Sequence, residues 1–174
     1  FDIGDRVAVT RPSYPCYRNM LTAFGCEVVE LSVDASTRFQ PTPELLAAAH
    51  ADAPLAGVVV ASPSNPTGAG YNREELKELT DVLIRHPHVW VMTDDMYEHL
   101  MYDDFEFVTP AQLEPRLYER TLTCDGVSKA YAMTGWRIGY AAGPKELIGA
   151  MRKIQSQSTS NPCTISQWAS VEAL

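Results

Sequence analysis

The sequence lacks the features that mark several large classes of protein. Among its 174 residues, 22 are acidic and 14 are basic, so the formal net charge is −8. Proteins that bind nucleic acid need a basic surface instead. The sequence has no apolar run as long as a membrane span, and no signal peptide is visible. From these absences we expect a cytoplasmic protein with neither a nucleic-acid nor a membrane partner.

Patterns for binding metals and nucleotides are missing as well. The cysteines form no C-x-x-C pair, and we expect them to be reduced and buried: Cys16, Cys26, Cys124 and Cys163. His86, His88 and His99 make no recognisable ligand set, so we expect no metal. In Gly68-Ala69-Gly70, Arg73 occupies the third glycine position of a dinucleotide-binding loop. This weighs against a nucleotide-binding domain.

What the sequence does contain is an alternation of short apolar runs and amphipathic stretches. The apolar runs predict strands at 6–10, 26–31, 57–61, 89–93, 120–124 and 138–142. The amphipathic stretches predict helices at 17–24, 43–50, 72–85 and 145–156, and Thr42 and Asn72 are expected N-caps. Strands that alternate with helices indicate an α/β fold, with a mainly parallel sheet and helices on both faces.

The loop after the third predicted strand presents Asn65. Active groups of such folds gather beyond the carboxyl ends of the strands. Pro63 and Pro66 restrict the backbone on either side of Asn65. Its amide could therefore be held in place to donate to a phenolate or a carboxylate. A plain proline-rich turn, with asparagine as a turn former, is the alternative.

The fourth predicted strand is followed by two acidic residues and then, after Met96, by Tyr97. A carboxylate at a buried strand end needs a cationic partner. Asp94 and Tyr97 are about one helical turn apart, so both could face one cleft. One alternative is a metal site, although suitably spaced ligands are missing. The other is a helix N-cap, for which Asp95 is the better candidate.

Tyr14 follows the first predicted strand. Pro15 comes directly after it and keeps its backbone extended. In this position the ring could stack on a flat ligand. Taken alone, such a tyrosine is more often a core aromatic.

Lys129 lies in the segment that carries the most chemical information, between the fifth and sixth predicted strands. A lysine that forms a Schiff base must be held on a rigid element. Arg137 follows in a glycine-flanked turn and suits a phosphate. A ligand with an aldehyde at one end and a phosphate at the other is pyridoxal 5′-phosphate. For Lys129 alone, a surface lysine between two strands is the alternative.

Three ordered motifs give the chain a resemblance to a known family. They are Ser-Asn-Pro-Thr-Gly at 64–68, Asp-x-x-Tyr at 94–97, and Ser-Lys followed by Gly-Trp-Arg-Ile-Gly at 128–139. In this order they resemble the class I aminotransferases, which belong to the fold-type I group of pyridoxal-phosphate enzymes. The resemblance covers nearly the whole chain and is closest to the bacterial aspartate aminotransferases, some of which also transaminate prephenate. It implies a three-layer α/β/α large domain and a homodimer.

The resemblance also implies a role for each candidate residue. The catalytic residues would be Lys129, which holds the cofactor covalently and moves a proton, Asp94, which pairs with the pyridine nitrogen, and Tyr97. The other cofactor contacts would be Tyr14 on the ring face, Asn65 and Tyr97 at the ring oxygen, and Arg137, Ser128 and Gly126 at the phosphate. Tyr14 and Asn65 would also contact the substrate.

We expect the chain to be a fragment of a longer protein. It has no initiator methionine, and residues 168–174 end inside a helical pattern. On the resemblance, residues 1–174 are part of the large cofactor-binding domain, while an N-terminal segment and a C-terminal small domain lie outside the chain. Ser156 stands where another aspartate aminotransferase subgroup has an arginine for the distal carboxylate of the substrate. The residues that bind the substrate carboxylates are therefore expected outside the fragment.

The implied activity is transfer of an amino group between an amino acid, aspartate or glutamate, and a 2-oxo acid by a ping-pong mechanism. Two alternatives stay open. One is another fold-type I enzyme, such as a prephenate or aromatic aminotransferase or a C–S lyase, because a fold does not determine a reaction. The other is a noncatalytic aminotransferase-like domain of a transcriptional regulator.

Overall fold

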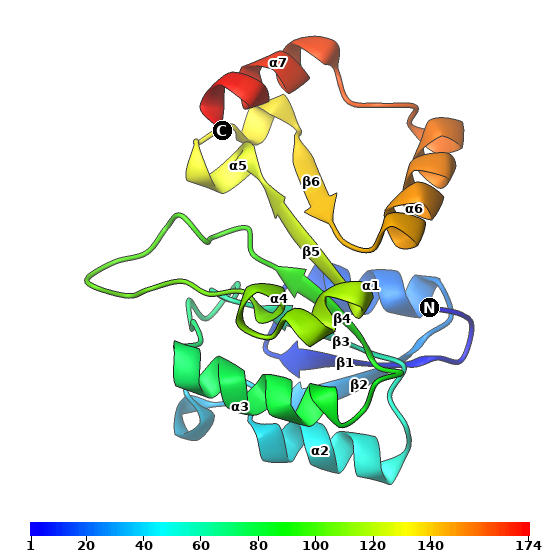
Figure 1. Ribbon diagram of the computed structural model, residues 1–174, viewed down its shortest axis with the longest axis vertical. Coiled ribbons are helices and arrows are strands. Elements are labelled where there is room, and N and C mark those ends of the chain that lie inside the picture. Colours follow the sequence, from blue (N-terminus) through cyan, green and yellow to red (C-terminus); the bar gives the residue numbers. More distant parts are fainter.

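Six strands form one sheet in the order β2-β1-β3-β4-β5-β6 (Figure 1). The computed structural model describes residues 1–174. The strands are β1 Arg6–Arg11, β2 Glu27–Ser32, β3 Gly57–Ala61, β4 Trp90–Asp94, β5 Thr121–Gly126 and β6 Gly139–Ala142. All neighbours pair in parallel except β5 and β6, which are antiparallel. All six predicted strands are present, and the mainly parallel sheet is confirmed.

The four predicted helices are present as α1, α2, α3 and α6, and further helices occur beside them. They are α1 Pro15–Ala23, α2 Pro43–Asp52, α3 Arg73–Ile84, α4 Pro110–Leu113, α5 Val127–Ala130, α6 Lys145–Ser158 and α7 Thr164–Ala173. Short 3-10 turns lie at Ala35–Thr37, Pro115–Arg120 and Thr134–Trp136. Thr42 accepts the backbone N–H of Leu45, and Asn72 forms a reciprocal capping box with Glu75. Each of these side chains satisfies a donor that the first helical turn leaves unpaired.

Helices cover both faces of the sheet. Figure 1 shows α2 and α3 side by side on one face and α1 on the other. Most of the core lies under α2 and α3, where leucines of α3 such as Leu76 and Leu79 belong to the same buried cluster as Val58 and Val91. Burial of these apolar surfaces is the main force that holds the layers together. The expected α/β/α architecture is confirmed.

A smaller apolar cluster lies under α1. Val7, Val9 and Val59 are at most 5% exposed, and Tyr17 and Leu21 of α1 pack against them. Both faces of β1 and β3 are covered by helices, so side chains on both faces must be apolar. The sequences of these strands are therefore nearly continuous runs of valine and alanine. The cluster also holds α1 close to the carboxyl ends of the strands.

Helices α6 and α7 lie beyond β6 (Figure 1). Both carry large apolar side chains that are exposed. Ile154 of α6 is 70% exposed and Trp168 of α7 is 71% exposed. The regular spacing of apolar residues predicted the α6 helix correctly. No residue of α6 is buried, so this spacing does not face the core of the described chain. None of the seven helices combines the length and the apolar character that crossing a membrane would require.

The cysteines differ from expectation in their burial. All four are free, but Cys163 is exposed and the other three are only half-buried. Cys26 shows the reason, because it lies just before β2, at an outer edge of the sheet where no further strand covers it.

Candidate active site

The strand order reverses beside β1, which lies between β2 and β3. In open α/β sheets, ligands bind at such a switch point, beyond the carboxyl ends of the strands. A cavity of about 250 Å³ lies there. It is lined by Tyr14, Tyr17, Ala61, Pro63, Asn65, Asp94, Met96, Tyr97, Ser128, Lys129 and Arg137. Side chains that are far apart in the sequence therefore meet in one cavity.

Seven of the eight residues predicted for the site line this cavity, and Gly126 does not. The N–H of Gly126 donates to Oδ1 of Asp125 at 2.6 Å, so it is already paired. A Cβ added at Gly126 would lie 2.8 Å from the carbonyl oxygen of Ile138. The absence of a side chain at Gly126 thus permits the close approach of β5 and β6.

Asp94 is the last residue of β4 and is held at both carboxylate oxygens. Oδ1 accepts the backbone N–H of Met96 at 3.2 Å, and Oδ2 accepts the hydroxyl of Tyr17. Two donors on different segments restrict rotation of the carboxylate. Asp94 thus has a defined orientation in the cavity wall.

Asp95 does not have the N-cap role that the sequence suggested. No helix begins directly after β4. The backbone N–H of Met96 donates to the carboxylate of Asp94 and not to that of Asp95. Asp95 is only 3% exposed, and burial raises its pKa to about 7, with smaller contributions from nearby Glu98 and Asp125. The chain turns after β4 without forming a helix, so there are no unpaired helical N–H groups for Asp95 to cap.

Lys129 lies on α5, a single helical turn directly after β5. Val127 at the start of this turn is fully buried, while Lys129 is exposed toward the cavity. The buried neighbour anchors the turn, and the exposed amine stays accessible. This is the arrangement that a reactive lysine on a rigid element requires.

Arg137 sits in a left-handed backbone conformation with φ 56°, at the end of the Thr134–Trp136 turn. Its Nη1 donates to the carbonyl oxygen of Thr134 at 3.0 Å. A left-handed conformation is uncommon outside glycine and persists where the surroundings impose it, often at binding sites. The hairpin between α5 and β6 thereby brings the guanidinium to the same cavity as Lys129.

Tyr14 is 43% exposed, so it is not a core aromatic. It precedes Pro15 at the start of α1 and meets Tyr17 edge to face, with ring centroids 5.6 Å apart and planes at 79°. Tyr17 was not predicted as a site residue. Its only sequence signal was its position one helical turn after Tyr14, which places both rings on the same side of α1.

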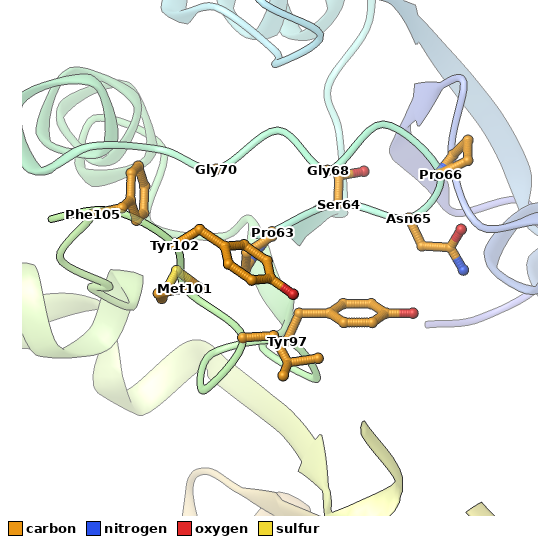
Figure 2. Close-up of a pocket in the computed structure, with 11 residues that line it drawn as sticks. Pro63, Ser64, Asn65, Pro66, Gly68, Gly70, Tyr97, Met101, Tyr102 and Phe105 are labelled. Atoms are coloured by element: carbon orange, nitrogen blue, oxygen red, sulfur yellow. The ribbon is translucent and has the colours of Figure 1, made fainter. Parts of the chain in front are cut away.

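A second, larger pocket of about 560 Å³ adjoins the first and shares Pro63, Asn65 and Tyr97 with it. Figure 2 shows the polar ends of Asn65 and Tyr97 turned to the same side, while Phe105 lies at the other end of the pocket. The rest of its wall includes Leu100, Met101 and Tyr102, and none of its lining residues is charged. No sequence motif predicted this pocket.

Comparison with known proteins identifies the family to which the chain belongs. Residues 1–174 match the family described as Aminotransferase class I and II. The chain belongs to this family. It is 58% identical over 171 residues to an aspartate/prephenate aminotransferase of Cereibacter sphaeroides and 54% identical over 173 residues to an aspartate aminotransferase of Rhizobium meliloti.

The structural comparison agrees with the sequence comparison. The crystal structure of the aspartate aminotransferase from Rhizobium meliloti superposes with a TM-score of 0.96 at 54% identity. The alignment covers 99% of this chain and 43% of that structure. For the two relatives, 98% and 99% of this chain covers 42% of their length. The chain thus spans less than half the length of these aminotransferases.

Proposed function

We propose that the chain forms the cofactor-binding part of a pyridoxal-phosphate-dependent aminotransferase that acts on aspartate or glutamate and a 2-oxo acid. The observation that carries the proposal is the shared cavity, where Lys129, Asp94 and Arg137 meet Asn65 and Tyr97. The names of the relatives, which include aspartate and prephenate, support this substrate class. The proposed domain assignment is a partial large domain, completed by an N-terminal segment and a small domain.

The lining of the cavity fits pyridoxal 5′-phosphate at each end. The amine of Lys129 would hold the aldehyde, and Arg137 with the hydroxyl of Ser128 would hold the phosphate. Asp94 would pair with the ring nitrogen. The ring itself would be bounded by Tyr14 on its face and by Asn65 and Tyr97 at its oxygen. When bound, the cofactor would accept the electrons released at the α-carbon of the substrate.

Lys129 performs the proton transfer in this proposal. Its Nζ would take the α-proton of the bound substrate and later return it, as a general base and then a general acid. The buried Val127 keeps the helical turn in place, and the exposed amine can move within the cavity. Asn65 and Tyr14 line the cavity where substrate would enter.

The distal carboxylate of a dicarboxylic substrate needs a cation that this chain does not supply. Lys129 and Arg137 are the basic residues that line the cavity, and both have other tasks in the proposal. Ser156, at the position where an arginine was considered, is exposed on α6. We therefore place the cation on the part of the protein outside these residues or on the partner subunit of a homodimer.

The proposed function is tested on the full-length protein. Half-reactions with aspartate, glutamate, phenylalanine and alanine are followed by the absorbance of the cofactor. Aspartate or glutamate should give the highest kcat/KM, with 2-oxoglutarate or oxaloacetate as acceptor. If alanine matches aspartate, the dicarboxylate assignment is wrong. If no amino acid converts the cofactor, the aminotransferase proposal is wrong.

A further inference from the structure

Tyr17 contacts the central carboxylate of the cavity from a helix that none of the three sequence motifs includes. Its hydroxyl donates to Oδ2 of Asp94, across 77 positions of sequence. The other oxygen of Asp94 accepts the N–H of Met96 at 3.2 Å. If the hydroxyl were removed, Oδ2 would lose this donor and the carboxylate could turn about its remaining bond.

The surroundings of Asp94 keep its neighbours uncharged. Burial raises the pKa of Tyr17 well above its ordinary range, and the hydrogen bond to Asp94 and its charge add to this. Cys124 faces Asp94 across the β4–β5 pairing, and burial raises its pKa to about 11, with the charge of Asp94 next in importance. Both neighbours therefore stay protonated near neutral pH, and Tyr17 acts as a hydrogen-bond donor.

The position of Tyr17 is set by packing and not by the cavity. Its ring lies against the cluster of Val7, Val9 and Val59 under α1. Its other side meets the edge of Tyr14. The hydroxyl thus approaches Asp94 from a fixed direction, because the apolar part of the side chain is anchored in the smaller core.

We propose that Tyr17 is a positioning residue: it orients the Asp94 carboxylate, and so controls how firmly the site holds a protonated ring nitrogen. The inference rests on the proposed function for its consequence in catalysis. The contact itself belongs to the protein without cofactor. A hydrogen bond to a carboxylate stabilises the ionised state and is stronger than one between neutral groups.

The experiment compares Tyr17→Phe with Tyr118→Phe in the full-length protein. Tyr17→Phe keeps the ring and its packing and removes only the hydroxyl. Tyr118 is 52% exposed and lies outside both pockets, so its variant controls for the loss of a phenol. The dissociation constant of pyridoxal 5′-phosphate should rise about tenfold in Tyr17→Phe, which corresponds to about 1.4 kcal/mol. It should not change in Tyr118→Phe.

Two further readouts separate positioning from general stability. The pH titration of the absorbance of the bound cofactor should shift in Tyr17→Phe, and kcat should fall by a larger factor than KM rises. In the protein without cofactor, the NMR signals of the Asp94 carboxyl carbon and of the Met96 amide should shift in Tyr17→Phe at neutral pH, because Oδ2 loses its donor. A variant that only loosened the fold would lower the melting temperature and leave these signals and the cofactor titration in place.

The outcomes for the inference and for the proposed function are distinct. If the Asp94 and Met96 signals are the same with and without the Tyr17 hydroxyl, the inference is overturned, whatever the cofactor does. If the parent protein binds no pyridoxal 5′-phosphate while Asp94 still responds to Tyr17→Phe, the proposed function fails and the positioning contact stands.

Discussion

At the scale of single residues, the reactive group of Lys129 and the residue that anchors its helix are different side chains. The amine is exposed, while its neighbour Val127 is buried and anchors α5. Truncation of the lysine should therefore remove reactivity and leave the packing in place.

We predict that Lys129→Ala abolishes covalent attachment of pyridoxal 5′-phosphate and lowers the amino-transfer rate by several orders of magnitude, with the melting temperature nearly unchanged. The physical reason is that no other amine lines the cavity. Borohydride reduction of the loaded full-length protein followed by peptide mapping checks the attachment site. A label on any lysine other than Lys129 would falsify the assignment.

Asp95 differs from its neighbour Asp94 because it is buried away from the cavity. Its pKa is raised to about 7, chiefly by burial, from an ordinary value of 3.8. The folded protein thus holds this proton more tightly than the unfolded chain does. The stabilisation from Asp95 is fully present below about pH 4 and is lost as the pH rises through 7.

Asp95→Asn should remove this pH dependence, because an amide cannot ionise. Relative to the parent protein, the variant should gain on the order of 2 kcal/mol in unfolding free energy between pH 5 and pH 8. Urea unfolding at the two pH values measures the gain. The exposed Asp104 provides the control, and Asp104→Asn should show no such gain. An equal difference at both pH values would show that Asp95 is not held protonated.

At the scale of elements, the β5–β6 hairpin links the two cations of the site. Lys129 follows β5 and Arg137 precedes β6, and Gly126 pairs with Gly139 where the strands meet. The strands can approach this closely because Gly126 carries no side chain at this point. The geometry of the hairpin therefore affects binding and stability together.

Gly126→Ala should lower stability and weaken cofactor binding at the same time. The new Cβ would lie 2.8 Å from the backbone oxygen of Ile138, and backbone cannot move aside cheaply. We expect a loss of about 1 to 3 kcal/mol in unfolding free energy.

Gly149→Ala on α6 is the matched control, since nothing lies within 4 Å of its added Cβ. Alanine in a helix should raise stability there by up to about 1 kcal/mol. Thermal unfolding and cofactor titration compare the two variants, and unchanged binding in Gly126→Ala would contradict the coupling.

At the scale of the whole molecule, the distribution of apolar surface is uneven. The apolar side chains of the core under α2 and α3 are buried. On α6 and α7, by contrast, Ile154, Ile165 and Trp168 are at least 70% exposed. Surfaces of this kind mark sites of interaction with other protein segments. The polar segment 156–162 comprises the end of α6 and most of the link to α7.

We predict that the full-length protein is a homodimer whose activity depends on the dimer. The resemblance to the family implies a homodimer, and the exposed Ile154, Ile165 and Trp168 offer an apolar surface for a second subunit. Light scattering across a dilution series, with activity measured at each concentration, tests this. A monomer that keeps full activity at low concentration would rule the prediction out.

The sequence by itself determined the elements and the residues at their ends. Apolar periodicity predicted all six strands, and the caps at Thr42 and Asn72 were evident because capping depends on residues three positions apart. The motifs at the strand ends could also be predicted to lie together, because the carboxyl ends of parallel strands meet at one edge of the sheet. Seven of the candidate residues accordingly line one cavity.

Only the tertiary structure decided which side chains meet. The contact of Tyr17 with Asp94 spans 77 positions and depends on the packing of α1, which no local pattern encodes. The burial of Asp95 and the packing role of Gly126 likewise depend on neighbouring strands. Periodicity in a sequence reports which face of an element is apolar, whereas the partner on that face is chosen by strand order and helix placement, which are set by long-range packing.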